Sequence, residues 1–496
     1  MSEVPILNTP ITLSIAILYL LICLGIGVWS YTRTKTAADY FITGQTIGLW
    51  IVAIAAFSAI MSGFGFVGGP GLTYKFGTSS LWITFAQTIG FALSWFLLAK
   101  RMRLMAEVRN VLSLPDAVAA RYRSDGARFW MAVALLFGVL GYLGTQVQAM
   151  GVVMQTIFGV DLVTGALIGL AILAVYTIMG GILAGVYTDF FQGVIMVFAS
   201  VAIFLWCLHV GGGMTNISQH VAAADPKLMG PFGGMPIFAA LTWYFLFAVG
   251  NAGQPHMATK LYMSKDINQL KWGAFISAGA YALCSLLWMS LGLTMRALTE
   301  TGAHAPLKNP DLAATTFLME YTPEVLAGLV LAGLMAAIMS TGNSFLNLGA
   351  AAIVRDIPQA FGKKIQNEVF WARLATLGLV VVSTIFALYM KTLVALLGVF
   401  GWGTFAAAVV PVVVIGLNWK RGTATAAIAA TIVGLVANFA LEIMAKYNVY
   451  KVPHGAIVGA VATMLAIAVY LAVSIIQKKP GEESDLDPDI KEVLEA

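Results

Sequence analysis

A cluster of hydroxyl and amide side chains interrupts an otherwise apolar segment of the chain. Residues 336–344 read AAIMSTGNS, so that Ser340 and Thr341 are adjacent and Asn343 and Ser344 follow them. Hydroxyl and carbonyl oxygens are the donors that small hard cations prefer, and polar groups inside a membrane helix mark ion pathways. These residue types therefore indicate a cation site. The alternative is that the hydroxyls bond back to carbonyls one turn earlier in the same helix.

The composition requires a membrane. Of the 496 residues, 59% are apolar and 10% are charged, whereas ordinary globular domains carry about 25% charge. So few charges cannot cover a surface that faces water, and lipid must cover most of it. The net charge of +5 gives no indication of a nucleic-acid partner.

Thirteen apolar segments approach or exceed the length of about 20 residues that crosses a bilayer. They are residues 10–30, 46–72, 79–99, 127–157, 161–179, 187–210, 235–256, 272–297, 324–353, 370–390, 393–417, 423–443 and 455–477. Placing the N-terminus outside leaves about three quarters of the 28 Lys and Arg residues in the cytoplasm, as the positive-inside rule requires. We therefore expect a multi-pass protein of the inner (plasma) membrane with a cytoplasmic C-terminus. Residues 478–496 would form a cytoplasmic acidic tail, and the basic stretch Lys100–Arg128 would contact lipid.

Two of these segments are interrupted by residues that a regular helix does not favour. Glycine, proline and polar residues gather within Phe57–Gly71 in the second segment and within Phe247–His256 in the seventh. Unwound backbone at membrane depth is tolerated where it is buried or lines a cavity, and two such segments in matching positions are typical of an inverted-repeat transporter. Free carbonyls there can bind a cation, and free N–H groups an anion. The alternative is that Gly and Pro are simply frequent in membrane helices.

Three stretches of the chain resemble the sodium:solute symporter family. They are Ser62–Gly71 with Tyr74–Gly77, Tyr176–Gly181 with Thr188–Gly193, and Ala336–Ser344. The resemblance extends over nearly the whole length. It implies an all-α integral membrane protein with a LeuT-like inverted-repeat (5+5) core and one extra N-terminal helix. The chain would form a single transporter domain over residues 1–477, with repeats near 46–210 and 235–417.

The resemblance also implies a sodium site between the first broken helix and core helix eight. Its ligands would be backbone carbonyls and hydroxyls at Ser58, Met61, Ala337, Ser340 and Thr341. Five neutral oxygens can replace much of the water shell of sodium without a fixed charge that would hold the ion too tightly. Sodium would be the coupling ion and the only metal, and no organic cofactor is expected.

Asp189, Asn343 and Ser344 would form a second sodium site or a sodium exit path. In members of the family that bind two sodium ions, a serine stands where this chain has Asn343. The asparagine favours one sodium ion and an exit-path role for Asp189. The alternative is that Asp189 caps the start of the predicted helix at 187–210.

The substrate would bind between the two broken helices near the membrane midplane. The candidate contacts are aromatic, amide and hydroxyl side chains: Phe64, Phe66, Gln87, Gln146, Gln148, Phe247, Asn251, Gln254, Trp402 and Thr404. For each of them the alternative is ordinary packing or an interhelical hydrogen bond. No Lys or Arg lies near the middle of a predicted span, so helix N-termini, amides, hydroxyls and the sodium ion would hold an anionic substrate.

Departures from the proline symporters argue against proline, and Gly68–Gly71 with Tyr74–Gly77 resembles the pantothenate and monocarboxylate branch of the family, which favours a small carboxylate. Where those proteins carry an acid in the first broken helix this chain has Ile60, and where they carry Trp and Tyr it has Phe247 and Asn251. We expect sodium-coupled import of a carboxylate, such as a monocarboxylate or pantothenate, by alternating access. Proline or another amino acid is the alternative substrate, and a non-transporting membrane sensor is the alternative class. We expect no enzyme activity, no nucleic-acid partner, and a monomer that works in the lipid bilayer on a small molecule.

Overall fold

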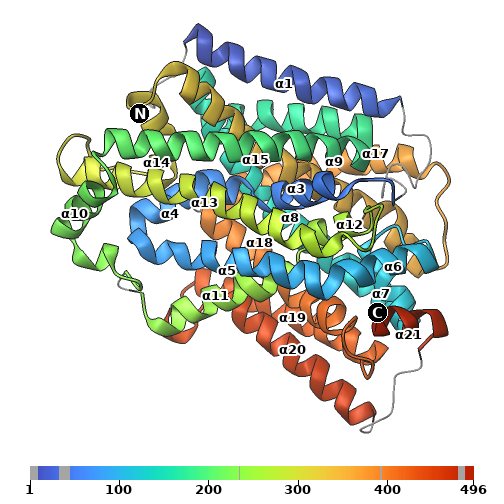
Figure 1. The fold of residues 1–496 in the computed structure, drawn as a ribbon. Helices are drawn as coiled ribbons and strands as arrows, with labels where there is room; N and C mark the ends of the chain where they lie inside the picture. The colour runs from blue at the N-terminus through green and yellow to red at the C-terminus, as the bar shows by residue number, and fades with distance from the viewer. Residues whose placement is uncertain (1–8, 33–44, 234, 391–393, 479–485) are drawn as a thin grey trace.

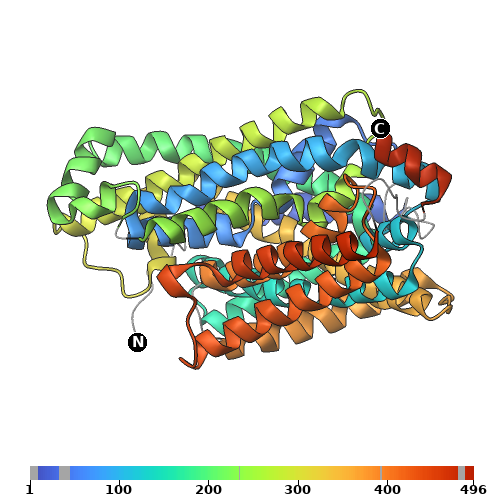
Figure 2. The same ribbon diagram turned by 90° about the horizontal axis from the view of Figure 1, so that it is seen from below.

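Helices account for nearly all of the regular structure. The computed structural model describes residues 9–32, 45–233, 235–390, 394–478 and 486–496, and within these ranges the β-structure is one isolated bridge between Ile47 and Ser264. Ten helices of the described residues are long and apolar enough to cross a membrane, and the long helices run roughly along one common direction (Figures 1 and 2). The prediction of an all-α membrane protein is confirmed.

The bundle is built from long helices and from helices that continue one another. The membrane elements are α1 (Pro10–Tyr31), α3 (Leu49–Ile60), η2 (Phe64–Gly68), α4 (Gly69–Phe76), α5 (Leu81–Ser94), η4 (Trp95–Ala99), α6 (Lys100–Arg109), α8 (Asp125–Phe158), α9 (Leu162–Val210), α11 (Ile237–Ala252), α12 (Pro255–Leu261), α13 (Leu270–Glu300), α15 (Glu324–Ala351), η7 (Ala352–Asp356), α17 (Glu368–Met390), α18 (Val394–Val409), η8 (Val410–Ile415), α19 (Ala424–Lys446) and α20 (Val458–Gln477). The short connecting elements are η3 (Gly77–Ser80), α7 (Leu114–Tyr122), α10 (Met214–Ala224), η5 (Pro226–Met229), η6 (Pro310–Leu312), α14 (Ala313–Glu320), α16 (Ile357–Ala360), η9 (Pro453–Gly455) and α21 (Pro488–Glu495).

Both predicted interruptions are breaks in the structure. The backbone of Met61 turns to an extended conformation (ψ 100°) where α3 ends, and a π-helical turn at η2 precedes α4. In the other segment α11 ends at Ala252, and α12 begins at Pro255, whose ring presets a helical φ and needs no N–H partner in the first turn.

The helix α9 forms two of the predicted spans. A straight helix of its 49 residues would be about 74 Å long, more than twice the hydrocarbon thickness of about 30 Å. It bends at Gly181, whose positive φ of 55° suits a residue without a side chain. The parts before and after this bend correspond to the predicted spans 161–179 and 187–210.

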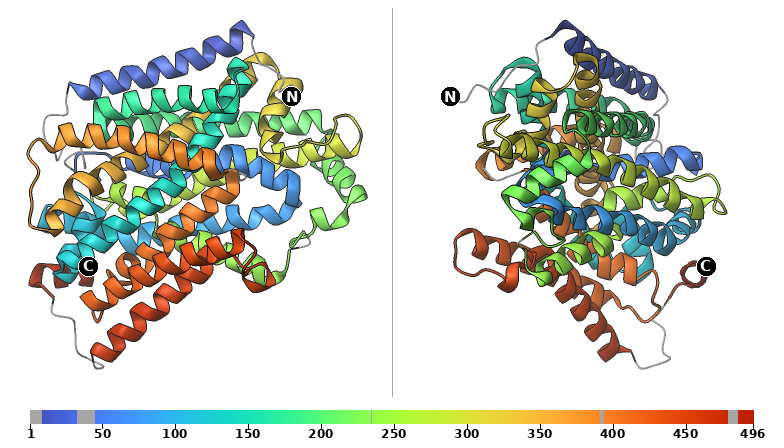
Figure 3. Two further views of the ribbon diagram at one scale, coloured as in Figure 1. Left: turned by 180° about the vertical axis from the view of Figure 1, so that it is seen from behind. Right: turned by 60° about the vertical axis from the view of Figure 1, so that its left-hand side comes forward.

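Burial separates a central pair of helices from an outer layer. The most apolar stretches of α15 and α18 are 83% and 89% buried, whereas those of α1 and α17 are 28% buried. The helices α1 and α20 lie along opposite edges of the bundle (Figures 1 and 3). Exposed apolar side chains on the outer layer, such as Val381 and Ile385 of α17, form the surface that lipid covers.

The C-terminal helix α21 packs against α6 at one end of the bundle. It buries Ile490, Val493 and Leu494, and its Asp489 pairs with Arg109 of α6 at 2.9 Å. The first described turn of α1 lies toward the opposite end of the bundle (Figure 1). The predicted acidic tail thus contains a docked helix, while residues 479–485 lie outside the described residues.

The short helix α7 braces the π-helical end of α18. The Tyr122 hydroxyl donates to the carbonyl of Val412 at 2.7 Å and lies 2.6 Å from the hydroxyl of Tyr470 on α20. Arg121 donates to the carbonyl of Gly416 at 2.8 Å. Carbonyls that leave the regular α-helical pattern need such partners when they are buried.

Tyr122→Phe removes the donor to Val412 and the hydroxyl partner of Tyr470. A buried polar group left without a partner costs about 1–3 kcal/mol, so we expect a lower melting temperature for the purified protein. Tyr447→Phe is the control, because the Tyr447 side chain is 66% exposed. Equal melting temperatures for the two variants would show that the brace does not contribute to stability.

Candidate functional site

The residues suggested for a sodium site meet where α3 ends beside the middle of α15. The Ser58 hydroxyl donates to the Ser340 hydroxyl at 2.9 Å, and the Thr341 hydroxyl donates to the carbonyl of Ala59 at 2.8 Å. These side chains are fully buried. Oxygens from two helices therefore lie together in the centre of the bundle.

Helix geometry explains how α15 presents its oxygens together. Ala337, Ser340 and Thr341 occupy positions i, i+3 and i+4, which share one face of a helix. Met61 is the C-cap of α3, where the carbonyls of a last helical turn lack intrahelical partners. The structure thus brings Ser58, Ser340 and Thr341 into contact, with Met61 at the end of α3 and Ala337 one turn before Thr341 on α15.

A buried ion pair lies next to this junction. The Asp189 carboxylate of α9 lies 2.7 Å from the Lys260 ammonium of α12, and their side chains are 0% and 2% exposed. Lys260 also donates to the Ser344 hydroxyl of α15 at 3.0 Å. The Ser340 hydroxyl neighbours Asp189, so that the ion pair and the hydroxyl cluster are contiguous.

Two expectations about this region are wrong. Lys260 lies between the predicted spans 235–256 and 272–297, whereas the structure places it on the buried helix α12, which follows the break at Gln254. The helix-cap alternative for Asp189 also fails, because Asp189 lies within α9, well past the bend at Gly181.

Asn343, the third residue suggested for a second sodium site, makes a contact within α15. Its side-chain carbonyl accepts a hydrogen bond from Asn347 at 3.2 Å.

A glycine allows α9 to approach this junction closely. A Cβ atom on Gly193 would lie 2.6 Å from Cγ2 of Ile54 and 3.3 Å from Cβ of Ser58. Any larger residue would push α9 away from α3. The motif Thr188–Gly193 therefore supplies both the Asp189 carboxylate beside the junction and the glycine that allows α9 to approach α3.

Aromatic rings from four helices gather between the two broken segments. Phe64 of η2 and Phe247 of α11 stack with ring centroids 5.6 Å apart, and Trp402 of α18 lies 5.3 Å from Phe247. Trp288 of α13 meets Phe64 edge-on at 5.5 Å. A Cβ on Gly398 would lie 2.8 Å from the Phe64 ring, so this glycine lets α18 close on the cluster.

Amide and hydroxyl groups of α8 satisfy the unwound backbone after α3. The Gly63 N–H donates to the side-chain oxygen of Gln146 at 3.0 Å, and Ser62 lies 3.0 Å from the hydroxyl of Tyr142. Tyr142 and Gln146 are four residues apart and share one helix face. The sequence analysis did not select Tyr142, although its spacing of four residues from Gln146 places both side chains on the same face.

The remaining amides form a second cluster around α11. Gln87 of α5 donates to Asn251 at 2.8 Å, Asn251 donates to Ser94 at 3.2 Å, and Gln254 donates to the carbonyl of Gly250 at 2.9 Å. The first two bonds hold the broken helix α11 against α5, and the third lies within the second broken segment. They leave the Gln87 and Gln254 side-chain carbonyls without partners among the described residues.

Three suggested substrate contacts point elsewhere. Phe66 packs near Gly333 of α15, Gln148 donates to the carbonyl of Ala387 on α17, and Thr404 accepts from Asn438 on α19. For these residues the alternative of ordinary packing or an interhelical hydrogen bond describes the contacts in the structure.

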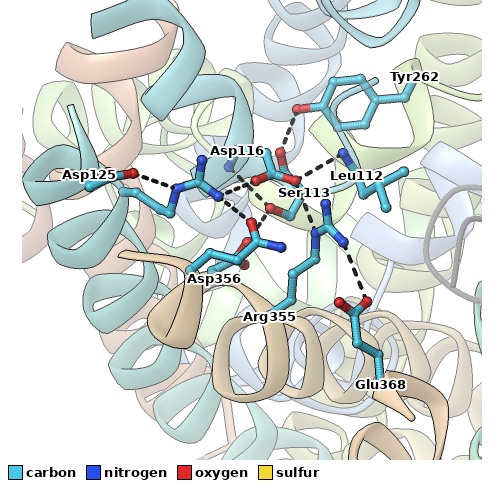
Figure 4. Close-up of polar contacts among 10 residues, drawn as sticks. Leu112, Ser113, Asp116, Asp125, Tyr262, Arg355, Asp356 and Glu368 are labelled. Atoms are coloured by element: carbon cyan, nitrogen blue, oxygen red, sulfur yellow. Dashed lines mark hydrogen bonds and ion pairs between the residues drawn. The ribbon is translucent and has the colours of Figure 1, made fainter. Parts of the chain in front are cut away.

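A charged network ties the helices together at the end of the bundle that carries α21 (Figure 4). Asp116 of α7 accepts from Arg128 of α8 at 2.6 Å and from Arg355 of η7 at 3.1 Å. Arg355 also reaches Glu368 of α17 at 3.4 Å. The pair of Asp116 and Arg355 joins segments that are distant in sequence, so no local pattern indicates it.

The same network includes the residue that follows the second broken helix. Tyr262 comes directly after α12 and donates to the carbonyl of Ser113, whose hydroxyl donates to Asp356 at 2.5 Å (Figure 4).

The expectation that the basic stretch Lys100–Arg128 contacts lipid is wrong for Arg103 and Arg121, which are buried and bonded to backbone carbonyls.

Comparison with known proteins gives a consistent result. A model of the sodium:solute symporter family matches residues 40–434. The osmoregulated proline transporter OpuE of Bacillus subtilis is 27% identical over 476 residues, covering 94% of this chain and 95% of the relative. The sodium/pantothenate symporter of Escherichia coli is 28% identical over 427 residues, covering 84% and 87%.

Solved structures confirm the LeuT-like fold. A Na⁺-coupled sialic acid symporter in a substrate-bound outward-open state superposes with a TM-score of 0.76 at 19% identity, covering 95% of this chain and 98% of the other. The nucleobase-cation symporter Mhp1 superposes with a TM-score of 0.50 at 15% identity, covering 93% and 99%. At such identities the likeness shows the fold.

Gln146→Leu removes the acceptor of the Gly63 N–H with little change in side-chain volume. The loss of a partner costs about 1–3 kcal/mol, or roughly 5-fold or more in an opening equilibrium. We expect faster amide hydrogen exchange in residues 62–68, measured by mass spectrometry. Gln148→Leu, two residues along the same helix, is the matched control and should leave exchange in this segment unchanged. Equal exchange in both variants would contradict the role of Gln146.

Proposed function

Because the chain belongs to the sodium:solute symporter family, we propose that it imports a small organic carboxylate together with sodium by alternating access. The observation that carries this proposal is the pairing of Ser58 with Ser340 and of Thr341 with the carbonyl of Ala59. These contacts join a broken helix to a central helix through oxygens that suit a hard monovalent cation.

The proposed sodium ligands are the oxygens of Ser58, Met61, Ala337, Ser340 and Thr341. A sodium ion bound there would bridge α3 and α15, and would stabilise the arrangement of the unwound segment that forms the substrate site. The driving energy is the electrochemical gradient of sodium, about 2.3 kcal/mol per charge for each 100 mV plus the concentration term.

The proposed substrate site is the aromatic cluster beside the unwound segment. Phe64, Phe247 and Trp402 supply apolar surface there. The side-chain amide nitrogen of Gln146 and the indole nitrogen of Trp288 are buried donors with no partner among the described residues. Unpartnered buried donors suit a ligand with acceptor oxygens, which supports a carboxylate. Proline also carries a carboxylate and is the second candidate, favoured by the proline transporters among the relatives.

We further propose the membrane arrangement of the chain. The repeats would be residues 46–210 and 235–417, and the end of the bundle that carries α7 and α21 would face the cytoplasm. At that end α21, which packs against α6, would also bind the loop after η8. Glu495 of α21 pairs with Lys420 of that loop at 2.6 Å. The working unit would be a monomer.

Uptake into proteoliposomes identifies the substrate. The purified protein would be given labelled pantothenate, pyruvate, acetate, proline and a sugar, each with and without an inward sodium gradient. We expect sodium to stimulate uptake of one carboxylate. Sodium-stimulated uptake of proline would replace the carboxylate proposal, and uptake driven by a pH gradient alone would contradict sodium coupling. No uptake of any solute would favour a sensor.

Ser340→Ala and Thr341→Ala each remove one proposed sodium ligand. The loss of one hydrogen-bonding partner costs about 1–3 kcal/mol, which weakens the affinity for sodium roughly 5–150-fold. The sodium concentration for half-maximal uptake should therefore rise by that factor in each variant. Thr376→Ala is the control, because its buried hydroxyl bonds within α17 to the carbonyl of Ala372. An unchanged sodium dependence in both variants, at normal expression, would remove this site from the mechanism.

A further inference from the structure

The buried ion pair brings an ammonium group that is tethered to the chain to the junction of three helices. Lys260 of α12 reaches the Asp189 carboxylate of α9 at 2.7 Å and the Ser344 hydroxyl of α15 at 3.0 Å. All three side chains are buried. Charges inside a membrane protein are rare and paired, and mark positions with a role in function.

The position of the ammonium relates it to the proposed sodium site. Ser340 and Ser344 are one helical turn apart on the same face of α15, and Ser340 neighbours Asp189. The ammonium therefore lies about one turn from the hydroxyls proposed to bind sodium.

The ammonium contacts a carboxylate oxygen and a hydroxyl oxygen, which are donor types that hard cations such as sodium also take. The other candidate ligand at this position is engaged, because the Asn343 side-chain carbonyl accepts from Asn347. Asp189 and Ser344 thus already have a bound cation that carries one positive charge and is tethered to the chain.

We propose that the Lys260 ammonium takes the place of a second sodium ion at Asp189 and Ser344, and thereby sets the coupling at one sodium ion per substrate. This inference rests on the proposed sodium-coupled transport. The lysine would neutralise Asp189 throughout the cycle, so that only the site at Ser340 and Thr341 exchanges its cation with solution.

The packing of α12 keeps the ammonium in place. His256, one turn before Lys260 on the same face of α12, is buried and meets the Phe345 ring of α15 edge-on at 4.5 Å. Tyr262 ties the other end of α12 to Ser113. The helix is therefore held at both ends, which supports the position of the lysine beside Asp189.

The proposal predicts that removal of the ammonium creates a sodium site. Lys260→Ala leaves the Asp189 carboxylate buried and opens space for an ion. The full-length variant should bind two sodium ions, compared with one for the unmodified protein, in equilibrium binding of radiolabelled sodium without substrate. The Hill coefficient for sodium in uptake should rise from one toward two.

Two further variants test the assignment. Asp189→Asn combined with Lys260→Ala removes both charges and should restore one sodium ion. Lys265→Ala is the matched control, since Lys265 is exposed and close in sequence, and should bind one. If Lys260→Ala cannot be purified, Lys260→Met replaces it.

The outcomes separate the two proposals. Two sodium ions bound by the unmodified protein, or one bound by the Lys260 variant, would overturn the role of the lysine while leaving sodium coupling intact. No sodium bound by the unmodified protein would overturn the proposed function itself, and the role of the lysine with it.

Discussion

Backbone groups that are released inside a membrane bundle need partners, and this constraint organises the centre of the molecule. Where α3 ends, the carbonyl of Ala59 accepts from Thr341 of α15, and the N–H of Gly63 donates to Gln146 of α8. The N–H of Phe64 donates to the Ser62 hydroxyl. The lipid tails at this depth offer no groups that could replace these bonds. The broken helix is therefore fastened to two other helices, and any change in its conformation must exchange those bonds.

A second constraint acts on charge. A carboxylate and an ammonium can remain at this depth because each is the partner of the other. The pair joins α9 to α12, and the bond from Lys260 to Ser344 extends it to α15. The central helix α15 thus carries two polar clusters along one face, one that meets the first broken segment and one that meets the second. This arrangement gives a physical route by which the states of the two segments are linked.

Close packing shapes the hydroxyl junction and the aromatic cluster. Glycines stand where helices approach most nearly, at Gly193 beside α3 and at Gly398 beside the Phe64 ring. In a membrane, where apolar side chains gain nothing by leaving lipid, association depends on such close contacts and on interhelical hydrogen bonds. The same glycines allow α9, which carries Asp189, and α18, which carries Trp402, to approach the first broken segment.

The amino-acid sequence by itself determined the class of the protein. Its apolar segments, the two interruptions and the motif Ala336–Ser344 were enough to predict an all-α membrane bundle with a broken-helix core, because these features depend on local composition. Contacts between distant segments were decided by tertiary structure. Gln146 and Gln148 look equivalent in the sequence, yet they are about 200° apart around α8, and only one faces the unwound segment. Lys260 lies outside the predicted spans, but it is buried on α12, the helix that follows the break at Gln254. In a chain whose helices are apolar on every face, periodicity does not show which face turns inward, so pairings such as Asp189 with Lys260 arise only when the helices pack.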